Sequence, residues 1–161
     1  AALEDIAADY LAATLDDMQV LIGRKELCVV VDLPADLPPV RGDSQVLHLI
    51  LGSLLSNACK FTPPQGAVTI SAAMEGDRVA VHVTDTGIGI PEEEQGRIFE
   101  RFYQVEDSLR RKHGGIGLGL AIAREMAGLI RAEIGVRSKV DEGSTFTLRL
   151  QRGRVRPTPA P

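Results

Sequence analysis

The first third of the chain carries two stretches with the apolar period of an amphipathic helix. In residues 2–22 apolar side chains recur at intervals of three and four, and Gly23 follows the last of them. In residues 43–61 the same period follows Asp43, a residue type that caps helix N-termini. We therefore expect two amphipathic helices, over 2–22 and 43–61, the first of them ended by Gly23.

Other segments carry the pattern of strands. Residues 27–33 form a β-branched run that stops at Pro34, which predicts a short buried strand. Residues 67–73 and 78–84 alternate in polarity around Glu75-Gly76-Asp77, which predicts a β-hairpin. Residues 133–138 and 144–150, joined by a turn at 141–143, predict two more strands.

The second half also contains helical and irregular segments. Pro91 and three glutamates after it predict a short helix that begins at Pro91 and ends near Phe102. Residues 103–114 are polar and basic without an apolar period, which indicates a loop long enough to act as a lid. An apolar helix is expected over residues 118–130.

The order of these elements predicts an α/β (α+β) fold built as a two-layer sandwich. We expect a mixed, mostly antiparallel sheet with helices packed on one face. A chain of 161 residues suits one such core. The domain is expected to span residues 1–151, because residues 152–161 are rich in proline and arginine and predict a disordered tail or linker.

Composition narrows the classes of partner. A net charge of −4 and only 4% aromatic residues argue against a nucleic-acid surface or direct contact with an anionic membrane. No apolar run approaches the roughly 20 residues that span a bilayer. Cys28 and Cys59 lack metal or disulfide spacing, so we expect buried, reduced thiols and a cytoplasmic domain. These observations leave open whether the parent protein is anchored to a membrane.

Three polar residues share one face of the second predicted helix. Ser53, Asn57 and Lys60 lie at positions i, i+4 and i+7. An amide oxygen suits Mg²⁺ that keeps its other ligands from water and phosphate, and a lysine supplies a point charge for phosphate. The triplet equally fits the solvated face of a surface helix.

Two glycine-rich turns supply further candidates. Asp85-Thr86-Gly87-Ile88-Gly89 follows a strand, so Asp85 is either part of an ordinary turn or an acceptor for an exocyclic amine such as that of adenine. Residues 115–119 read Gly-Ile-Gly-Leu-Gly and open a helix, where backbone N–H groups and the helix dipole bind anions such as triphosphate. The spacing of the glycines at 115, 117 and 119 excludes both the P-loop and the dinucleotide-binding fingerprint. Arg101 is the first candidate to offset phosphate charge.

Taken together, these motifs resemble those of histidine kinase catalytic domains. The resemblance covers about residues 3–150 and rests on five motifs in the family's order. They are Asn57-Ala58-Cys59-Lys60-Phe61-Thr62, Asp85 to Gly89, Ile98-Phe99-Glu100-Arg101-Phe102-Tyr103, Gly115 to Leu120, and Gly143-Ser144-Thr145-Phe146. It implies the Bergerat sandwich shared with DNA gyrase, MutL and heat-shock chaperone ATPases, with ATP and Mg²⁺ bound between the second helix and a lid.

The resemblance also implies a role for each matching residue. Asn57 would coordinate Mg²⁺, Lys60 would contact phosphate and Arg101 would neutralise it. Phe61 would pack on the adenine and Asp85 would accept from its amino group. Ser144, or alternatively Thr145, would hold an ordered water near the base. The remaining binding residues would shape the base pocket or hold the triphosphate: Gly87, Gly89, Ile90, Gly115, Gly117, Leu118 and Gly119.

The chain departs from the family pattern at two places. Ser53 stands where histidine kinases often have Asn and the hydrolytic relatives have Glu, which disfavours gyrase-like water activation because serine has no carboxylate. Arg131-Ala132 replaces a common Gly-Gly pair.

The resemblance implies γ-phosphoryl transfer from ATP to a histidine. None of the chain's three histidines has the His-Glu-x-x-x-Pro surroundings of a phosphoacceptor. We therefore expect a separate dimerisation and phosphoacceptor domain as partner, a response regulator beyond it, and a monomeric isolated domain. The alternatives are a degenerate nucleotide-binding regulatory module and an ATPase of the gyrase or MutL class.

Overall fold

Five strands form the main sheet of the structure, a computed structural model that describes residues 3–4, 12–41, 43–100 and 119–153. Their order is β2-β4-β5-β7-β6. β2 runs parallel to β4, and the other neighbours pair antiparallel, so the predicted mixed, mostly antiparallel sheet is confirmed. The strands are β2 (Cys28–Asp32), β4 (Ala67–Glu75), β5 (Arg78–Asp85), β7 (Gly143–Gln151) and β6 (Glu133–Lys139).

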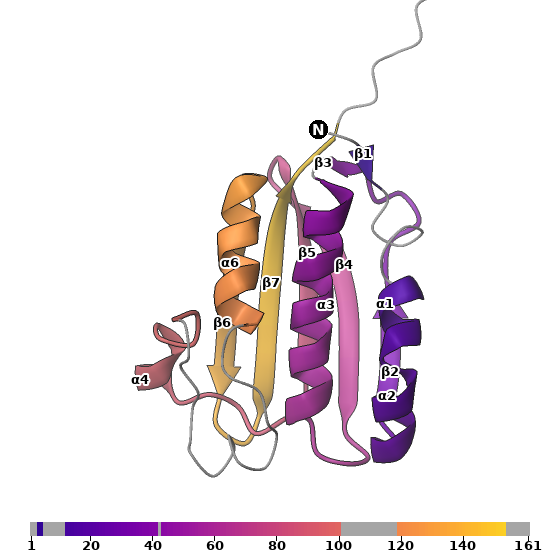
Figure 1. Cartoon of the computed structure of the whole chain (residues 1–161), viewed down its shortest axis with the longest axis vertical. Helices are drawn as coiled ribbons and strands as arrows, with labels where there is room; N and C mark the ends of the chain where they lie inside the picture. The colour runs from indigo at the N-terminus through magenta and orange to yellow at the C-terminus, as the bar shows by residue number, and fades with distance from the viewer. Residues whose placement is uncertain (1–2, 5–11, 42, 101–118, 154–161) are drawn as a thin grey trace, which may run out of the picture.

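The helices cover one face of this sheet (Figure 1). α3 (Ser44–Phe61) and α6 (Gly119–Leu129) lie side by side over the central strands, and α1 (Ala12–Asp17) and α2 (Gln19–Lys25) pack against α3. Apolar side chains between the layers are fully buried, among them Leu47, Leu54, Val83 and Leu148. The predicted two-layer sandwich is therefore confirmed.

α3 is the central element of the helical layer, and it forms where its pattern predicts. The Asp43 side chain caps its N-terminus by accepting hydrogen bonds from the backbone N–H groups of Gln45 (2.9 Å) and Val46 (3.2 Å). Leu47, Leu51 and Leu54 recur on the buried side of the helix. The burial of this apolar face fixes the rotation of α3, and thereby the direction of its polar side chains.

The first predicted helix differs from the structure. Leu3 and Glu4 form strand β1, which pairs antiparallel with β3 (Val40–Arg41). The described helix is broken at Met18, and it continues past Gly23 to Lys25. At Leu3, pairing with the distant strand β3 outweighs the local helical period. At the other end, the helix stops at Lys25 and not before Gly23.

Strand β2 is correctly placed, but it is not buried. It lies at the edge of the sheet, where Val30 and Val31 are 46% and 45% exposed. Cys28 is exposed as well, and only Cys59 is the buried free thiol that we expected. A β-branched run indicates a strand without indicating its place in the sheet, which explains the error.

The remaining elements agree with the predictions apart from their ends. Pro91 is the N-cap of α4 (Glu92–Gln95) rather than its first helical residue, and the helix is only four residues long, followed by turns up to residue 99. Arg152 bridges Val40, and the Gly153 N–H donates to the Pro39 carbonyl, so the chain stays attached to the domain just beyond residue 151. No helix among the described ranges is long and apolar enough to cross a bilayer.

Two helices end on residues other than glycine held in the left-handed region. Glu26 (φ 53°) follows α2 and Arg131 (φ 57°) follows α6. Each is the left-handed residue of a Schellman motif, because N–H groups reach back to the helix: Leu27 to Ile22 and Glu26 to Gly23, and Ala132 to Ala127 and Arg131 to Gly128. Arg131 is one of the two departures from the family pattern, so this turn carries strain that a glycine would not.

Replacing Arg131 with glycine should stabilise the domain. The left-handed conformation disfavours a residue with a Cβ, and we expect Arg131→Gly to raise the free energy of unfolding by about 1 kcal/mol. Urea denaturation followed by circular dichroism measures the change. Arg131→Ala is the matched control, because it removes the exposed side chain but keeps the Cβ. A glycine variant no more stable than the alanine variant would show that the turn is unstrained.

Candidate functional site

The C-terminal half of α3 forms one wall of the candidate site. Asn57 is half-buried, Lys60 is exposed, and Phe61 is the last helical residue. Thr62 ends the helix while both its N–H (3.1 Å) and its hydroxyl (2.7 Å) donate to the Ala58 carbonyl. The helix therefore delivers an amide, an ammonium and an aromatic ring within its last turns.

A buried carboxylate stands at the end of β5. Asp85 is only 6% exposed, and its Oδ1 accepts hydrogen bonds from the backbone N–H groups of Gly87 (2.8 Å) and Ser144 (3.3 Å). Burial raises the pKa of Asp85, and the hydrogen bonds from Gly87 and Ser144 oppose that rise. A carboxylate kept from water and fixed by backbone donors is a directed hydrogen-bond acceptor.

The turn after Asp85 is pressed directly against its neighbours. A Cβ on Gly87 would lie 2.6 Å from the Phe61 carbonyl oxygen, so the end of α3 touches this turn. Gly89 (φ 73°) is left-handed, and a Cβ there would collide with the Lys139 carbonyl. These two glycines let α3 and the β6–β7 turn approach the backbone of residues 85–90 from either side.

Ser138 and Gln95 hold this turn from the other side, and sequence reasoning missed both of them. The Ser138 hydroxyl accepts from the Ile90 N–H (2.8 Å), donates to the Gly143 carbonyl (2.9 Å) and lies 2.7 Å from Ser144 Oγ. The Gln95 amide donates to the carbonyls of Ile90 and Ser138, both at 2.9 Å. The only trace of this network in the sequence is a serine on each side of the 141–143 turn.

Ser144 and Thr145 point to opposite faces of the sheet. Ser144 is the register partner of Asp85 and is buried beside it. Thr145 is the partner of Thr84, and their hydroxyl oxygens lie 3.1 Å apart on the face away from the helices. Ser144 and Thr145 are the two candidates for holding an ordered water, and of these only Ser144 lies beside Asp85.

The start of α6 approaches α3 near the polar triplet. A Cβ on Gly119 would lie 3.2 Å from Ser53 Oγ, one helical turn before Asn57. The structure thus brings Gly119, the last glycine of the second glycine-rich turn, to the same helix as Asn57 and Lys60. The other candidates on that side, Arg101, Gly115, Gly117 and Leu118, lie outside the described residues.

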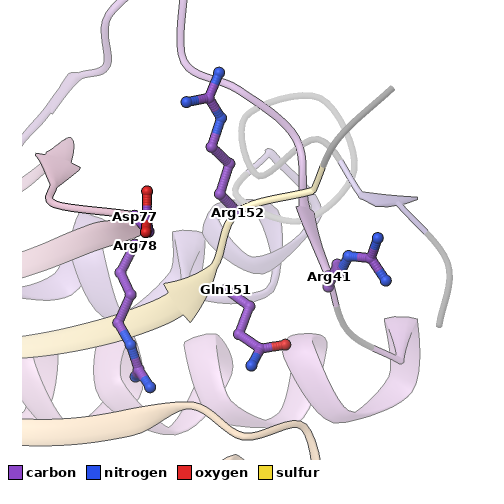
Figure 2. Close-up of a pocket in the computed structure, with 5 residues that line it drawn as sticks. All are labelled: Arg41, Asp77, Arg78, Gln151 and Arg152. Carbon is purple, nitrogen blue, oxygen red and sulfur yellow. The ribbon is translucent and has the colours of Figure 1, made fainter. Parts of the chain in front are cut away.

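A separate hollow of about 320 Å³ lies at the far end of the sheet. It is lined by Arg41, Asp77, Arg78, Gln151 and Arg152. β5 begins at Arg78 and ends at Asp85, so this hollow is a full strand length from the buried carboxylate. Figure 2 shows the guanidinium groups of its three arginines pointing away from one another, so they do not converge on one ligand.

Comparison with known proteins shows the family of the chain. Residues 42–154 match the family described as histidine kinase-, DNA gyrase B-, and HSP90-like ATPase. Similar proteins include the circadian input-output histidine kinase CikA of Synechococcus elongatus, 44% identical over 84% of this chain and 18% of the relative. The sensor histidine kinase RcsC of Salmonella typhimurium is 36% identical over 92% of this chain and 15% of the relative. The chain thus spans less than a fifth of the length of either relative.

Solved structures agree with the sequence relatives. Full-length ShkA in complex with AMPPNP superposes with a TM-score of 0.80 at 29% identity, over 96% of this chain and 32% of that chain. The catalytic domain of histidine kinase ThkA has the same fold, with a TM-score of 0.74 over 88% of this chain and 89% of that chain, at 22% identity. The chain therefore belongs to the histidine kinase-, DNA gyrase B- and HSP90-like ATPase family, as an ATP-binding catalytic domain of the sensor histidine kinase type.

Proposed function

We propose that this domain binds Mg·ATP beside the end of α3 and transfers the γ-phosphoryl group to a histidine on a separate dimerisation and phosphoacceptor domain. The observation that carries the proposal is the buried Asp85 carboxylate, anchored through Oδ1 where α3, β5 and β7 meet. From the acceptor histidine, the phosphoryl group would pass to a response regulator.

The adenine would bind at the Asp85 end of the site. Both described hydrogen bonds to Asp85 end on Oδ1, so Oδ2 is the oxygen that we assign to the adenine amino group. Phe61 and Ile90 supply apolar surface for the base, and Gly87 and Gly89 keep the backbone close. Ser144, whose hydroxyl lies 2.7 Å from that of Ser138, would hold a water near the ring.

The phosphates would extend along α3 towards the start of α6. Lys60 offers an exposed positive charge, and the amide oxygen of Asn57 suits the single protein ligand that nucleotide-bound Mg²⁺ commonly takes. In the described ranges, no three His, Cys, Asp or Glu side chains gather as a metal site of their own. Gly115, Gly117, Leu118 and Gly119 would donate backbone N–H groups, and Arg101 would add charge.

The chemistry that this arrangement supports is positioning and charge stabilisation. A nitrogen of the acceptor imidazole forms a bond to the γ-phosphorus while the bond to the β–γ bridging oxygen breaks, and ADP leaves with the electron pair. Lys60, Arg101 and the glycine-loop donors would stabilise charge on the transferred group and on ADP. Because ATP is the substrate, we place this reaction in the cytoplasm, whether or not the whole protein is anchored to a membrane.

The second candidate is a regulatory module that binds nucleotide without transferring phosphate. Ser53 favours it, because its hydroxyl occupies the α3 position next to Gly119, where a longer polar side chain could reach the phosphates. Nucleotide binding with no transfer to a competent acceptor would support this alternative over the kinase. ATP hydrolysis without an acceptor would instead support the gyrase-like alternative.

Replacing Asn57 tests the kinase proposal. With an acceptor domain and ATP labelled on its γ-phosphate, the wild-type domain should place acid-labile label on histidine. We expect Asn57→Ala to lower the transfer rate roughly 100-fold, because it removes the magnesium ligand. His48→Ala is the control on the same helix, since His48 is exposed and should affect neither folding nor label. Full activity of Asn57→Ala would contradict the assigned site.

Replacing Asp85 with asparagine should weaken ATP binding while it stabilises the nucleotide-free domain. The amide can still accept from Gly87 and Ser144, but we expect it to present a donor to the adenine amino group and to weaken ATP binding roughly 10- to 100-fold. The nucleotide-free domain should become more stable, because a buried charge is removed. Calorimetric titration and thermal melting measure the two effects. A variant that is destabilised and binds normally would refute the assignment.

The raised pKa of Asp85 fixes the direction in which the stability of the domain and its ATP affinity change with pH. Because burial raises the pKa of Asp85, the folded domain holds this proton more tightly than the unfolded chain does. Protonation of Asp85 therefore adds stability as the pH falls through that raised pKa, while it removes the carboxylate that we assign to adenine. Wild-type ATP affinity should fall over this range, and the affinity of Asp85→Asn should stay flat.

A further inference from the structure

Lys25 extends from the end of α2 to the end of α3. Its Nζ donates hydrogen bonds to three backbone carbonyls, those of Cys59 (2.9 Å), Lys60 (2.7 Å) and Thr62 (3.0 Å). An ammonium group has three N–H donors, so one lysine can hold several carbonyls at once. Lys25 is half-buried, and its partners lie 34 to 37 residues further along the chain.

These carbonyls are the ones that an α-helix leaves without a partner. The last carbonyls of a helix have no intrahelical donor, and they form the negative end of its dipole. A cation placed there both satisfies the carbonyls and offsets the dipole. Lys25 therefore acts as a C-terminal cap for α3, supplied by a different helix.

The backbone of Lys25 strengthens the same junction. Its carbonyl accepts from the Gln65 N–H (2.7 Å), and the Cys28 N–H donates to the Gly66 carbonyl (2.9 Å). The loop that follows α3 is thus tied to α2 and β2 on one side. On its other side, the Thr86 hydroxyl accepts from the Ala67 N–H (2.9 Å), which ties the start of β4 to the turn after β5.

The capped end of α3 is also the end that forms the nucleotide site. Lys60 is itself one of the residues whose carbonyl Lys25 holds, and the Phe61 carbonyl presses on Gly87 in the turn after Asp85. A shift of the last turn of α3 would move Lys60, which we assign to phosphate, together with Phe61, which we assign to the adenine wall of the site. Through its three hydrogen bonds to backbone carbonyls, Lys25 is connected to the site by way of α3.

We propose that Lys25 is a positioning residue for nucleotide binding, whose ammonium fixes the end of α3 against the Asp85–Gly89 turn. The inference rests on the proposed function, because it takes the end of α3 as the nucleotide site. It adds a residue from outside the five family motifs, on a helix that contributes no other residue to the site.

The experiment compares Lys25→Met with the wild-type domain. Methionine retains most of the apolar stem and removes every donor. Dissociation constants for ATP, ADP and AMP are measured by calorimetry at a temperature where circular dichroism shows each protein fully folded. We expect affinity to fall about 10-fold for all three nucleotides, because the adenine wall that they share is displaced. The transfer rate at saturating ATP should stay within roughly threefold of wild type, since bound nucleotide restores the turn.

The adjacent Arg24 supplies the matched control. Arg24 is exposed on the same helix, so Arg24→Met removes one positive charge and leaves the three Lys25 hydrogen bonds in place, and its affinities should equal those of the wild type. Lys25→Arg retains the charge and should lose only about threefold, because a planar fork reproduces part of the three-carbonyl contact. If Lys25→Met does not fold, the comparison of Lys25→Arg with the Arg24 control decides the question.

The outcomes separate this inference from the proposed function. A lower melting temperature with unchanged affinity in both Lys25 variants would make the residue purely structural and would overturn the inference. An equal loss in Arg24→Met would also overturn it, because bulk charge would then explain the effect. Wild-type nucleotide binding without phosphotransfer would overturn the kinase proposal alone. A wild-type domain that binds no nucleotide would overturn both.

Discussion

The hydrogen bonds to Asp85 Oδ1 are the constraint on which the candidate site depends. Gly87 and Ser144 donate from two different segments, so one oxygen fixes both the turn after β5 and the start of β7. Gly143, immediately before Ser144, is left-handed at φ 94°, and a Cβ there would collide with the Asp85 carbonyl. Such close contact leaves little space for water, and the carboxylate is consequently both rigid and poorly solvated.

Contacts on both sides extend this local constraint to the neighbouring elements. Phe61 closes one side through its carbonyl against Gly87, and Ser138 closes the other through Ile90 and Ser144. Each of these contacts lies at the end of a helix or strand, where backbone groups are not used by the regular element. The sheet and α3 therefore fix the distances between the site residues. The backbone groups that are left unpaired at the ends of these elements supply hydrogen-bond donors and acceptors.

The sequence predicts the elements whose signals are local. α3 follows from Asp43 and its apolar period, and the β4–β5 hairpin follows from alternation around Gly76, which is left-handed at φ 63°. The ends of α2 and α6 are less predictable, because Glu26 and Arg131 adopt a conformation that glycine usually takes. β1 was missed for a different reason, since its pairing with β3 joins segments almost forty residues apart.

The same distinction applies to the site. Asp85, Ser144 and the residues on α3 come from motifs, and the structure brings Ser144 beside Asp85 and Gly119 beside Ser53 on α3. Ser138, Gln95 and Lys25 have no motif, because each acts on a backbone group far away in the sequence or across a turn. Any residue type with a suitable donor could serve there, so the pattern of side chains does not reveal them.

A buried carboxylate with a raised pKa costs the domain stability, and in the proposed function a bound ligand would offset part of that cost. Under the proposed function, an adenine amino group would offer a donor to Asp85, and its charge would then be better satisfied than in the domain alone. The donors on Oδ1 hold the carboxylate in place before the ligand arrives, so little ordering of Asp85 is left for binding. The junction at Lys25 would serve the same end for α3, because its ammonium holds three carbonyls at the end of that helix.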